Sequence, residues 1–255
     1  MAELEEKSLD SPIKARLYVL PYSHPSMAAR AMLVHKGIDH RVTELPAGAH
    51  PPILRVLGFP GGTVPAAKLD GRRVQGSREI ARSLDELRAE PPLFPTDPSR
   101  RRAVEEAERW GEEELQPLPR RFFRWGLVRD RALRAWFERA CGTPAPGFVA
   151  AVEGPVVRIF ARKSHADDET VKHDLRALPG MLDRVDSLIA EGALGGEAPN
   201  AADFQIASSI RVFMEQESIR PLVEGRPATE VAIRLFPDLD GPIPLRLPAE
   251  WLPRE

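Results

Sequence analysis

Ser23 lies in a short polar stretch, YSHPS, between an apolar run at residues 16–21 and a segment with helical spacing. The apolar run is typical of a buried strand, so Ser23 is expected where a strand ends and a helix begins. Free backbone amides at such a point stabilise an anion. A thiol held there loses its proton more easily, because the thiolate gains these interactions and the thiol does not. Cys141 is the only cysteine, so the stretch itself lacks the sulfur that redox chemistry needs.

Ser23 has alternative interpretations. Its side chain can simply cap the helix that follows, or a shifted register can put Ser26 or Tyr22 in its place. His24 is expected to be a solvent-facing loop residue rather than a general base. The sequence therefore offers Ser23 as the catalytic candidate, with Tyr22 and Ser26 as neighbouring pocket residues.

Residues 61–87 predict a strand, a tight turn, a second strand and a helix. Asp70-Gly71 is typical of a two-residue hairpin turn. Ser77 is expected to be the N-cap of the helix, with its side chain accepting a hydrogen bond from a free amide of the first turn. The amides behind Ser77 can also hold a carboxylate, so this helix start is a second candidate site.

The chain divides into three parts by its sequence patterns. Strand and helix signals alternate over residues 15–90, which indicates an α/β domain. A proline-rich linker follows, and residues 97–236 are expected to form an all-helical domain. A proline-punctuated tail, residues 237–255, completes the chain.

Two signals organise the helical part. Pro117 and Pro119 are expected to kink or break the helix that begins near residue 99. The spacing of Asn200 and Asp203 predicts a capping box, in which each side chain accepts a hydrogen bond from the backbone near the other residue. Both signals concern folding, so neither marks a site.

Composition and charge exclude several function classes. There are 36 basic and 38 acidic residues and a net charge of -2, which gives no reason to expect nucleic acid or an anionic membrane as partner. Hydrophobic residues make up 42% of the chain, but no stretch approaches the ~18–20 apolar residues of a membrane span. Residues 1–15 are acidic and polar, unlike a signal or transit peptide. We therefore expect a cytoplasmic protein with no disulfide and no metal site.

The stretch at residues 61–87 resembles the second half of the thioredoxin-like domain of cytosolic glutathione S-transferases. In that family a Val-Pro pair carries a cis-proline, and an acidic-Ser pair begins the following helix. Val64-Pro65 and Ser77 match this pattern, whereas Gly76 stands where the acidic residue is expected. The resemblance covers about residues 15–235, because the proline linker and the capping box also match.

The resemblance implies the glutathione S-transferase fold, an α/β N-terminal thioredoxin-like domain followed by an all-α C-terminal helical domain. Homodimers are usual in this family, which is the only ground for expecting one here. The positive charge is carried almost entirely by arginine, which suggests a GC-rich and bacterial genome.

The resemblance also implies a thiol-binding site for glutathione or another low-molecular-weight thiol. The backbone at Val64 and Pro65 would pair with the cysteinyl part, and Ser77 would help to hold the γ-glutamyl carboxylate. Gly76 has no carboxylate for the γ-glutamyl amino group, and Gln75 has only a neutral amide. A lost charged hydrogen bond is worth about 1.5–3 kcal/mol, so glutathione affinity should fall by about one to two decades.

Aligned with the serine-type members, Ser23 falls on the residue whose hydroxyl donates a hydrogen bond to the thiolate. Ser26 falls where two-cysteine redox relatives keep their second sulfur. Phe122, Phe123 or Trp125 could line the pocket for a hydrophobic electrophile, because the corresponding helix does so in the family. The alternative is that these aromatic side chains form the domain core and that the arginines beside them are solvated.

Two functions follow from this reasoning. The first is a glutathione S-transferase-like enzyme that conjugates glutathione or a related thiol to a hydrophobic electrophile. The second is a non-catalytic ligand-binding or scaffold protein that does not turn over glutathione, an interpretation that Gly76 favours. A further hypothesis is that the tail lies across the cleft as a lid.

Overall fold

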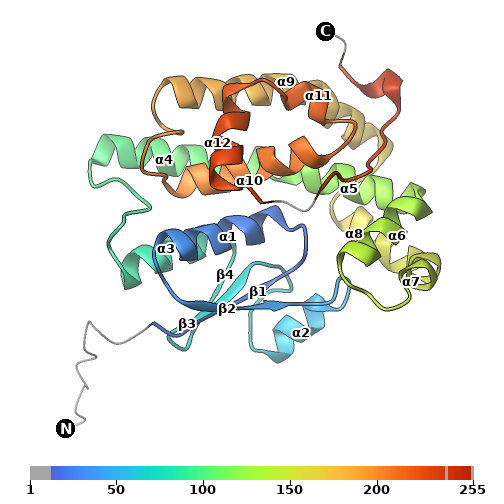
Figure 1. Ribbon diagram of the computed structural model, residues 1–255, viewed down its shortest axis with the longest axis horizontal. Coiled ribbons are helices and arrows are strands. Elements are labelled where there is room, and N and C mark those ends of the chain that lie inside the picture. The colour runs from blue at the N-terminus through green and yellow to red at the C-terminus, as the bar shows by residue number, and fades with distance from the viewer. Residues whose placement is uncertain (1–12, 239–240, 254–255) are drawn as a thin grey trace.

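The computed structural model describes residues 13–238 and 241–253. The expectation for the first twelve residues and part of that for the 237–255 tail lie outside the described residues. A four-stranded sheet forms one end of the molecule, and layers of helices cover it (Figure 1). No helix in the described ranges is both long enough and apolar enough to span a bilayer.

The sheet contains four strands in the order β2-β1-β3-β4. They are β1 (Ala15–Val19), β2 (His40–Glu44), β3 (Ala66–Leu69) and β4 (Arg72–Gln75). β1 runs parallel to β2 and antiparallel to β3, and β3 and β4 form a hairpin. The predicted hairpin turn is confirmed: Asp70 and Gly71 have φ values of 47° and 88°, as a two-residue turn of this hand requires.

Helices cover both faces of this sheet. α1 (His24–His35) and α3 (Ser77–Leu87) lie on the face toward the helical region, and α2 (His50–Val56) lies on the other (Figure 1). Apolar side chains fill the space between the sheet and helices α1 and α3, and Leu17 and Ile80 among them are fully buried. The predicted thioredoxin-like arrangement is confirmed.

The remainder of the described chain is almost entirely helical. Its helices are α4 (Pro98–Trp110), α5 (Pro117–Arg129), α6 (Arg131–Ala140), α7 (Pro146–Val152), α8 (Gly154–Lys163), α9 (Asp168–Ala190), α10 (Ala201–Glu215), α11 (Arg220–Val223) and α12 (Pro227–Leu235). The short 3-10 helix Ala249–Trp251 lies near the end of the chain. This confirms the expected fold class, a thioredoxin-like part followed by a helical part.

The predicted break near Pro117 takes the form of a π-helical turn, Gly111–Leu115, between α4 and α5. Proline has no backbone N–H, so it is tolerated at the first turn of a helix, and α5 begins at Pro117. A Cβ at Gly111 would lie 2.7 Å from Cγ1 of Ile206, so the close approach of α10 requires glycine there.

Helix α10 is the central element of the helical part, and nearly all of its side chains are buried. The predicted capping box is confirmed: Asn200 Oδ1 accepts from the Asp203 amide at 3.1 Å, and Asp203 Oδ2 accepts from the Asn200 amide at 2.9 Å. Both faces of the helix are covered, since α10 packs against α1 as well as α4 and α12.

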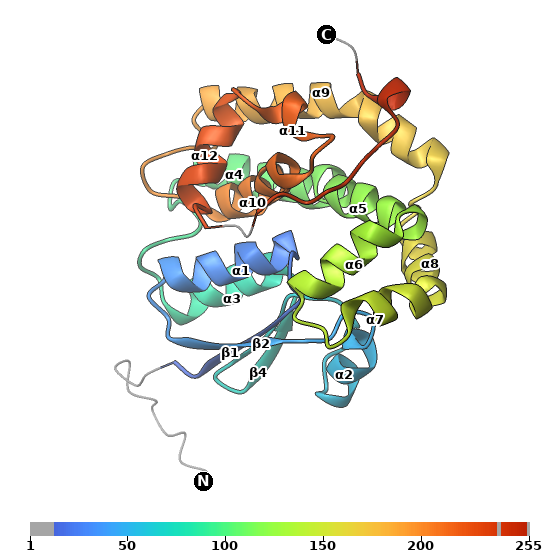
Figure 2. The ribbon, with the colours of Figure 1, turned by 45° about the vertical axis from the view of Figure 1, so that its right-hand side comes forward.

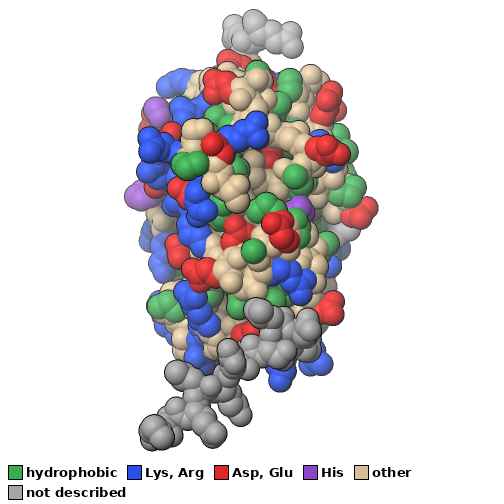
Figure 3. Space-filling view, turned by 90° about the vertical axis from the view of Figure 1, so that its left-hand side faces the viewer, with side chains coloured by type: hydrophobic (Ala, Val, Ile, Leu, Met, Phe, Trp, Pro, Cys, Tyr) green, Lys and Arg blue, Asp and Glu red, His purple; other side chains and the backbone are tan. Residues whose placement is uncertain are grey.

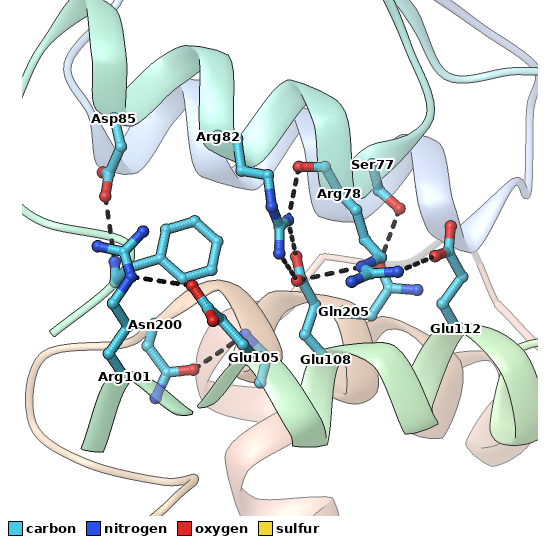
Figure 4. Close-up of polar contacts among 12 residues, drawn as sticks. Ser77, Arg78, Arg82, Asp85, Arg101, Glu105, Glu108, Glu112, Asn200 and Gln205 are labelled. Carbon is cyan, nitrogen blue, oxygen red and sulfur yellow. Dashed lines mark hydrogen bonds and ion pairs between the residues drawn. The ribbon is translucent and has the colours of Figure 1, made fainter. Parts of the chain in front are cut away.

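A polar layer joins α3 to the helices above it (Figure 4). Arg82 donates two hydrogen bonds to the buried carboxylate of Glu108, and Arg78 donates to Glu108 and to Glu112. Glu108 is only 1% exposed, so the two guanidinium groups compensate a charge that water does not reach. The thioredoxin-like part and the helical part are therefore held by charge as well as by apolar packing.

The outer surface near this layer is mixed in charge. On the side that lies to the left in Figure 1, Lys and Arg gather along one edge, interspersed with Asp and Glu (Figure 3). Hydrophobic side chains on that face are scattered rather than gathered in one patch. The face is therefore that of an ordinary solvated surface.

The described part of the tail packs against the helical part rather than leaving it (Figure 2). Ile243 pairs with Gln216, and the Ile243 amide donates to the Glu215 carbonyl at 2.7 Å. Trp251 contacts the ring of Trp125 edge-on, with 5.3 Å between the ring centroids. The tail thus closes one side of the helical part.

Candidate functional site

A cavity of about 220 Å³ lies where the thioredoxin-like part meets helices α5 to α8. Ser23 and Val64 line it from the sheet side. Phe123, Phe137 and Phe160 line it from the helical side. Two segments far apart in the sequence therefore build one pocket, and both of its walls contain polar as well as apolar side chains.

Ser23 is positioned at this wall by the junction of β1 and α1. It is the N-cap residue of α1 by backbone conformation, but its side chain makes no capping hydrogen bond. Instead, the Ser26 hydroxyl donates to Ser23 Oγ at 2.9 Å. The interpretation of Ser23 as a simple helix cap is therefore wrong, and the bond from Ser26 leaves the Ser23 hydroxyl proton for another acceptor.

The neighbours of Ser23 have different positions. Tyr22 lines the cavity, and its ring lies 5.2 Å from that of Trp136. Its φ of 58° is rare for a bulky residue, and such strained backbone is often found at functional sites. Ser26 is only 3% exposed and lies behind Ser23, outside the cavity wall. Ser26 thus contacts Ser23 and does not line the cavity.

The expectation for His24 is wrong, because its side chain is buried rather than solvent-facing. Its Nε2 lies 3.1 Å from the carbonyl oxygen of Gln116. Burial, followed by the charge of Arg120, lowers the pKa of His24 to about 3, so the ring is neutral at physiological pH. Nε2 then carries the proton that it donates to Gln116, and His24 ties α1 to the start of α5.

The backbone edge at Val64-Pro65 borders the cavity. The peptide bond between them is cis, and Val64 lines the cavity while Pro65 is buried. The Pro65 carbonyl accepts a hydrogen bond from the Gly76 amide at 2.9 Å. The edge is therefore fixed to the end of β4, and Val64 is its part nearest to the cavity.

The residues expected to hold the γ-glutamyl group lie outside the cavity wall. Gln75 braces the loop before Val64, because its Oε1 accepts from the Gly61 amide at 2.8 Å and its Nε2 donates to the Thr63 carbonyl at 2.7 Å. Ser77 is not the N-cap, as was expected; Gly76 takes that position. The Ser77 hydroxyl donates to Gln205 Oε1 of α10 at 2.8 Å (Figure 4), so its side chain serves the contact with the helical part.

Gly76 adopts a backbone conformation that is nearly exclusive to glycine, with φ of 94° and ψ of 144°. The absence of an acidic residue here is therefore coupled to the backbone. The first turn of α3 has no side-chain cap, so its amides remain available to an anion.

Replacing Gly76 by glutamate is expected to destabilise the protein by about 1–3 kcal/mol, because a side-chain-bearing residue must be forced into this conformation. A Cβ at this position meets nothing within 4 Å, so the cost is conformational and not steric crowding with neighbours. Chemical denaturation measures the change. Gly180→Glu is the control: it is also uncrowded but lies within helix α9, and it should stabilise by about 0.5–1 kcal/mol. Equal effects of the two substitutions would contradict this account.

The aromatic residues of α5 divide between the cavity and the core. Phe123 lines the cavity. Phe122 does not: it is fully buried and packs against Phe213 with 6.1 Å between ring centroids. Trp125 is buried and donates from Nε1 to Asp168 at 2.8 Å. The core interpretation therefore describes Phe122 and Trp125, because a helix presents neighbouring residues to different sides.

The sequence analysis did not name the charged residues of the cavity wall, and solvated α5 arginines were one of its two alternatives. Arg120 and Arg124, one helical turn apart, line the cavity. His50 also lines it, and burial followed by the charge of Arg124 lowers the pKa of His50 to about 4. Glu153 lines the cavity too, and burial together with Glu138 raises its pKa to about 7. The i,i+4 spacing of the two arginines indicates that they share one face of the helix, but it does not indicate what that face meets.

Cys141 is not part of this site. It does not line the cavity, and burial together with Glu138, Glu44 and Glu153 raises the pKa of its thiol to about 12. A thiol with such a pKa is a poor nucleophile at neutral pH. Within the described residues there is also no group of three or more metal-ligating side chains.

Comparison with known proteins agrees with this architecture. Residues 17–92 match the family model of the glutathione S-transferase N-terminal domain. No curated protein matches the chain by sequence.

Several solved structures share the fold over most of their length. One is a glutathione S-transferase from Rhodospirillum rubrum, with 18% identity, a TM-score of 0.55, and coverage of 93% of this chain and 97% of that one. A Tau class glutathione S-transferase from mango has 15% identity, a TM-score of 0.59, and coverage of 88% and 89%. The beta-etherase LigF from Sphingobium has 16% identity, a TM-score of 0.58, and coverage of 88% and 99%. The protein is therefore glutathione S-transferase-like in its N-terminal sequence and its overall fold.

Proposed function

We propose that this protein is a glutathione transferase-type enzyme that joins the sulfur of glutathione, or of a related small thiol, to a hydrophobic electrophile. The observation that carries the proposal is the state of Ser23. Ser23 lines the cavity, and its hydroxyl caps no helix and accepts a hydrogen bond from Ser26. Its own proton is therefore available to a thiolate in the cavity.

In this proposal the thiol first loses its proton to solvent, and the thiolate accepts a hydrogen bond from Ser23. This bond and the positive charge of Arg120 and Arg124 on the same cavity favour the thiolate over the thiol. The sulfur then attacks the electrophilic carbon, and a carbon–sulfur bond forms while the leaving group departs with its electron pair. Phe123, Phe137 and the other apolar side chains of the wall favour a hydrophobic electrophile.

The thiol is proposed to lie along the Val64 edge, with its acidic end toward the first turn of α3. The uncapped amides of that turn support this arrangement. The γ-glutamyl amino group would find no acidic residue at Gly76, and the Ser77 hydroxyl already donates to Gln205. Glutathione should therefore bind weakly. The affinity of a smaller thiol should be reduced less by the missing acidic residue.

The missing acidic residue at Gly76 and the engaged Ser77 hydroxyl also favour the second candidate function, a glutathione S-transferase-like binding protein that does not turn over glutathione. Such a protein would use the cavity to hold a ligand and would leave the α3 turn empty. The two functions differ in one testable respect: the binding protein would bind its ligand without any thiol, whereas the enzyme needs a thiol as co-substrate.

Calorimetric titration with glutathione, followed by a conjugation assay with an aryl halide, separates the two functions. The enzyme should bind glutathione at millimolar concentration or tighter and should form the thioether faster than the uncatalysed reaction. If glutathione does not bind, the assay is repeated with cysteine and other small thiols. No acceleration with any of these thiols would leave only the binding function.

A further inference from the structure

Two arginines on the cavity side of α5 have no carboxylate partner among the described residues. Arg120 makes no hydrogen bond or ion pair there. Arg124 makes one long hydrogen bond, 3.5 Å from Nη1 to the Phe160 carbonyl, and its guanidinium lies over the Phe160 ring. By contrast, Arg121 on the same helix pairs with Asp174 and does not line the cavity. On this helix, the arginine that packs against protein thus has a carboxylate partner, whereas the two that line the cavity have none among the described residues.

This arrangement is unfavourable in the free protein. Burial lowers the pKa of Arg124 to about 10, and the charge of Arg120 lowers it further in the same direction. Burial likewise lowers the pKa of Arg120, together with the charge of Arg121. Both guanidinium groups still remain charged at neutral pH. Like charges at i,i+4 repel, and partly buried cations without a counter-ion are poorly compensated, so a bound anion would relieve both costs.

The other ionisable groups of the wall do not supply that anion. His24 and His50 are neutral at pH 7, since their pKa values are lowered to about 3 and about 4. Glu153 forms no ion pair with either arginine, and its Oε1 is buried without a hydrogen-bond partner. The positive potential of the arginine pair is therefore directed into the cavity.

The side chains beside the arginines indicate what kind of group the anion should carry. Phe123 lies between them in the sequence of α5, and the guanidinium carbon of Arg124 lies over the Phe160 ring, 5.6 Å from its centroid. Phe137 completes the aromatic lining. Since an apolar cavity of about 150 Å³ holds benzene, a cavity of about 220 Å³ is large enough for a substituted ring.

We propose that Arg120 and Arg124 bind the carboxylate of a small aromatic acid whose ring lies against Phe123, Phe137 and Phe160. The planar guanidinium fork matches a carboxylate, and aromatic rings pack edge-on or offset against one another. The inference rests on the proposed function in one respect: it makes the electrophile of that reaction an aromatic carboxylate.

The test measures binding without any thiol or turnover. Calorimetric titration with 4-nitrobenzoate and with nitrobenzene compares the acid with a neutral compound of similar body. Wild-type protein should bind the acid at least about tenfold more tightly, as charge-assisted hydrogen bonds imply. Arg124→Gln and Arg120→Gln should each weaken binding of the acid about tenfold and leave nitrobenzene unchanged. Arg102→Gln, at an exposed arginine of α4, is the control and should change neither.

The melting temperature distinguishes ligand binding from a structural role. Removal of a repelling, partly buried charge should leave the melting temperature of the ligand-free Gln variants unchanged or higher. Equal affinity for the two compounds, no detectable binding of the acid, or loss of affinity only through a lower melting temperature would each overturn the proposal.

The carboxylate could also be the glycyl group of the tripeptide thiol, so a second arm uses glutathione and its glycyl monoethyl ester. If the arginine variants weaken glutathione but not its ester, and nitrobenzoate binds no better than nitrobenzene, the pair serves the thiol and the aromatic-acid proposal is wrong. Failure of the conjugation assay leaves the nitrobenzoate result intact, so the two proposals fail separately.

Discussion

Lys36→Met is expected to destabilise the protein by about 3–5 kcal/mol. Lys36 is only 1% exposed, and its ammonium group lies 2.5 Å from Asp85 Oδ1 and donates to the carbonyls of Arg88, Ala89 and Pro91. Methionine keeps the apolar volume but leaves these carbonyls and one carboxylate without the charge that compensates them. Loss of one partner of a buried pair costs more than loss of both, because the remaining charge is uncompensated.

This cost should be felt beyond α1, because the same cluster fixes the linker between the two parts of the molecule. Asp85 accepts from the amides of Leu93 and Phe94, at 2.9 and 3.2 Å, while Lys36 holds the carbonyls just before them. We expect Lys36→Met to loosen this linker together with the end of α3.

Urea unfolding measures the loss, with hydrogen exchange of the linker amides as a local readout. Lys68→Met is the matched control: Lys68 is exposed on β3, so its substitution should change stability by no more than about 0.5 kcal/mol. The double variant Lys36→Met with Asp85→Asn should be less destabilised than the sum of the single variants, because the two charges are coupled. A loss below about 1 kcal/mol for Lys36→Met would contradict the role given to this pair.

Much of the fold could be predicted because its signals are local. The hairpin at Asp70-Gly71 and the box at Asn200 and Asp203 each depend on residues within three positions of one another. Local hydrogen bonds and backbone preferences determine such features, so the sequence contains all that is needed. The break at Pro117 is of the same kind, since proline lacks the amide that continues a helix.

The predictions that were wrong concern side chains whose contacts lie far away in the sequence. Serine is a common N-cap residue, but the Ser77 hydroxyl donates to Gln205, 128 positions later. Gly76 occupies the N-cap position instead. His24 follows a strand in a polar stretch, yet the start of α5 buries it. Neither contact has a local signature, because both depend on how the helical part docks onto the sheet.

The cavity shows the same limit. Ser23 and Val64 could be singled out from their own neighbours in the sequence, but the arginines that line the same cavity could not. The spacing of Arg120 and Arg124 fits a solvated helix face as well as a cavity wall. Only the packing of α6 and α8 beside α5 gives that face its enclosure.

Ser23→Ala is expected to lower kcat/KM for thioether formation by about 10- to 100-fold. The variant loses one hydrogen bond to an anion, which is worth about 1.5–3 kcal/mol, and about 1.4 kcal/mol corresponds to a tenfold change in rate. The thiol bound in the cavity should also lose its proton less easily, with its pKa rising by about one to two units. Ultraviolet absorbance of the thiolate across a pH series measures this pKa directly.

The pH profile shows whether Ser23 acts on the thiolate or only on the fold. A lowered thiol pKa helps most below the pKa of the free thiol, near 8.5, so the variant should approach wild-type activity as the pH rises above that value. Ser26→Ala is the matched control: it removes the donor to Ser23 and leaves the Ser23 hydroxyl in place, so its effect should be several-fold smaller. Because Ser23 caps no helix, the melting temperature should stay nearly constant in both variants. Full activity of Ser23→Ala at neutral pH would remove Ser23 from the reaction while leaving the fold and the arginine pair untouched.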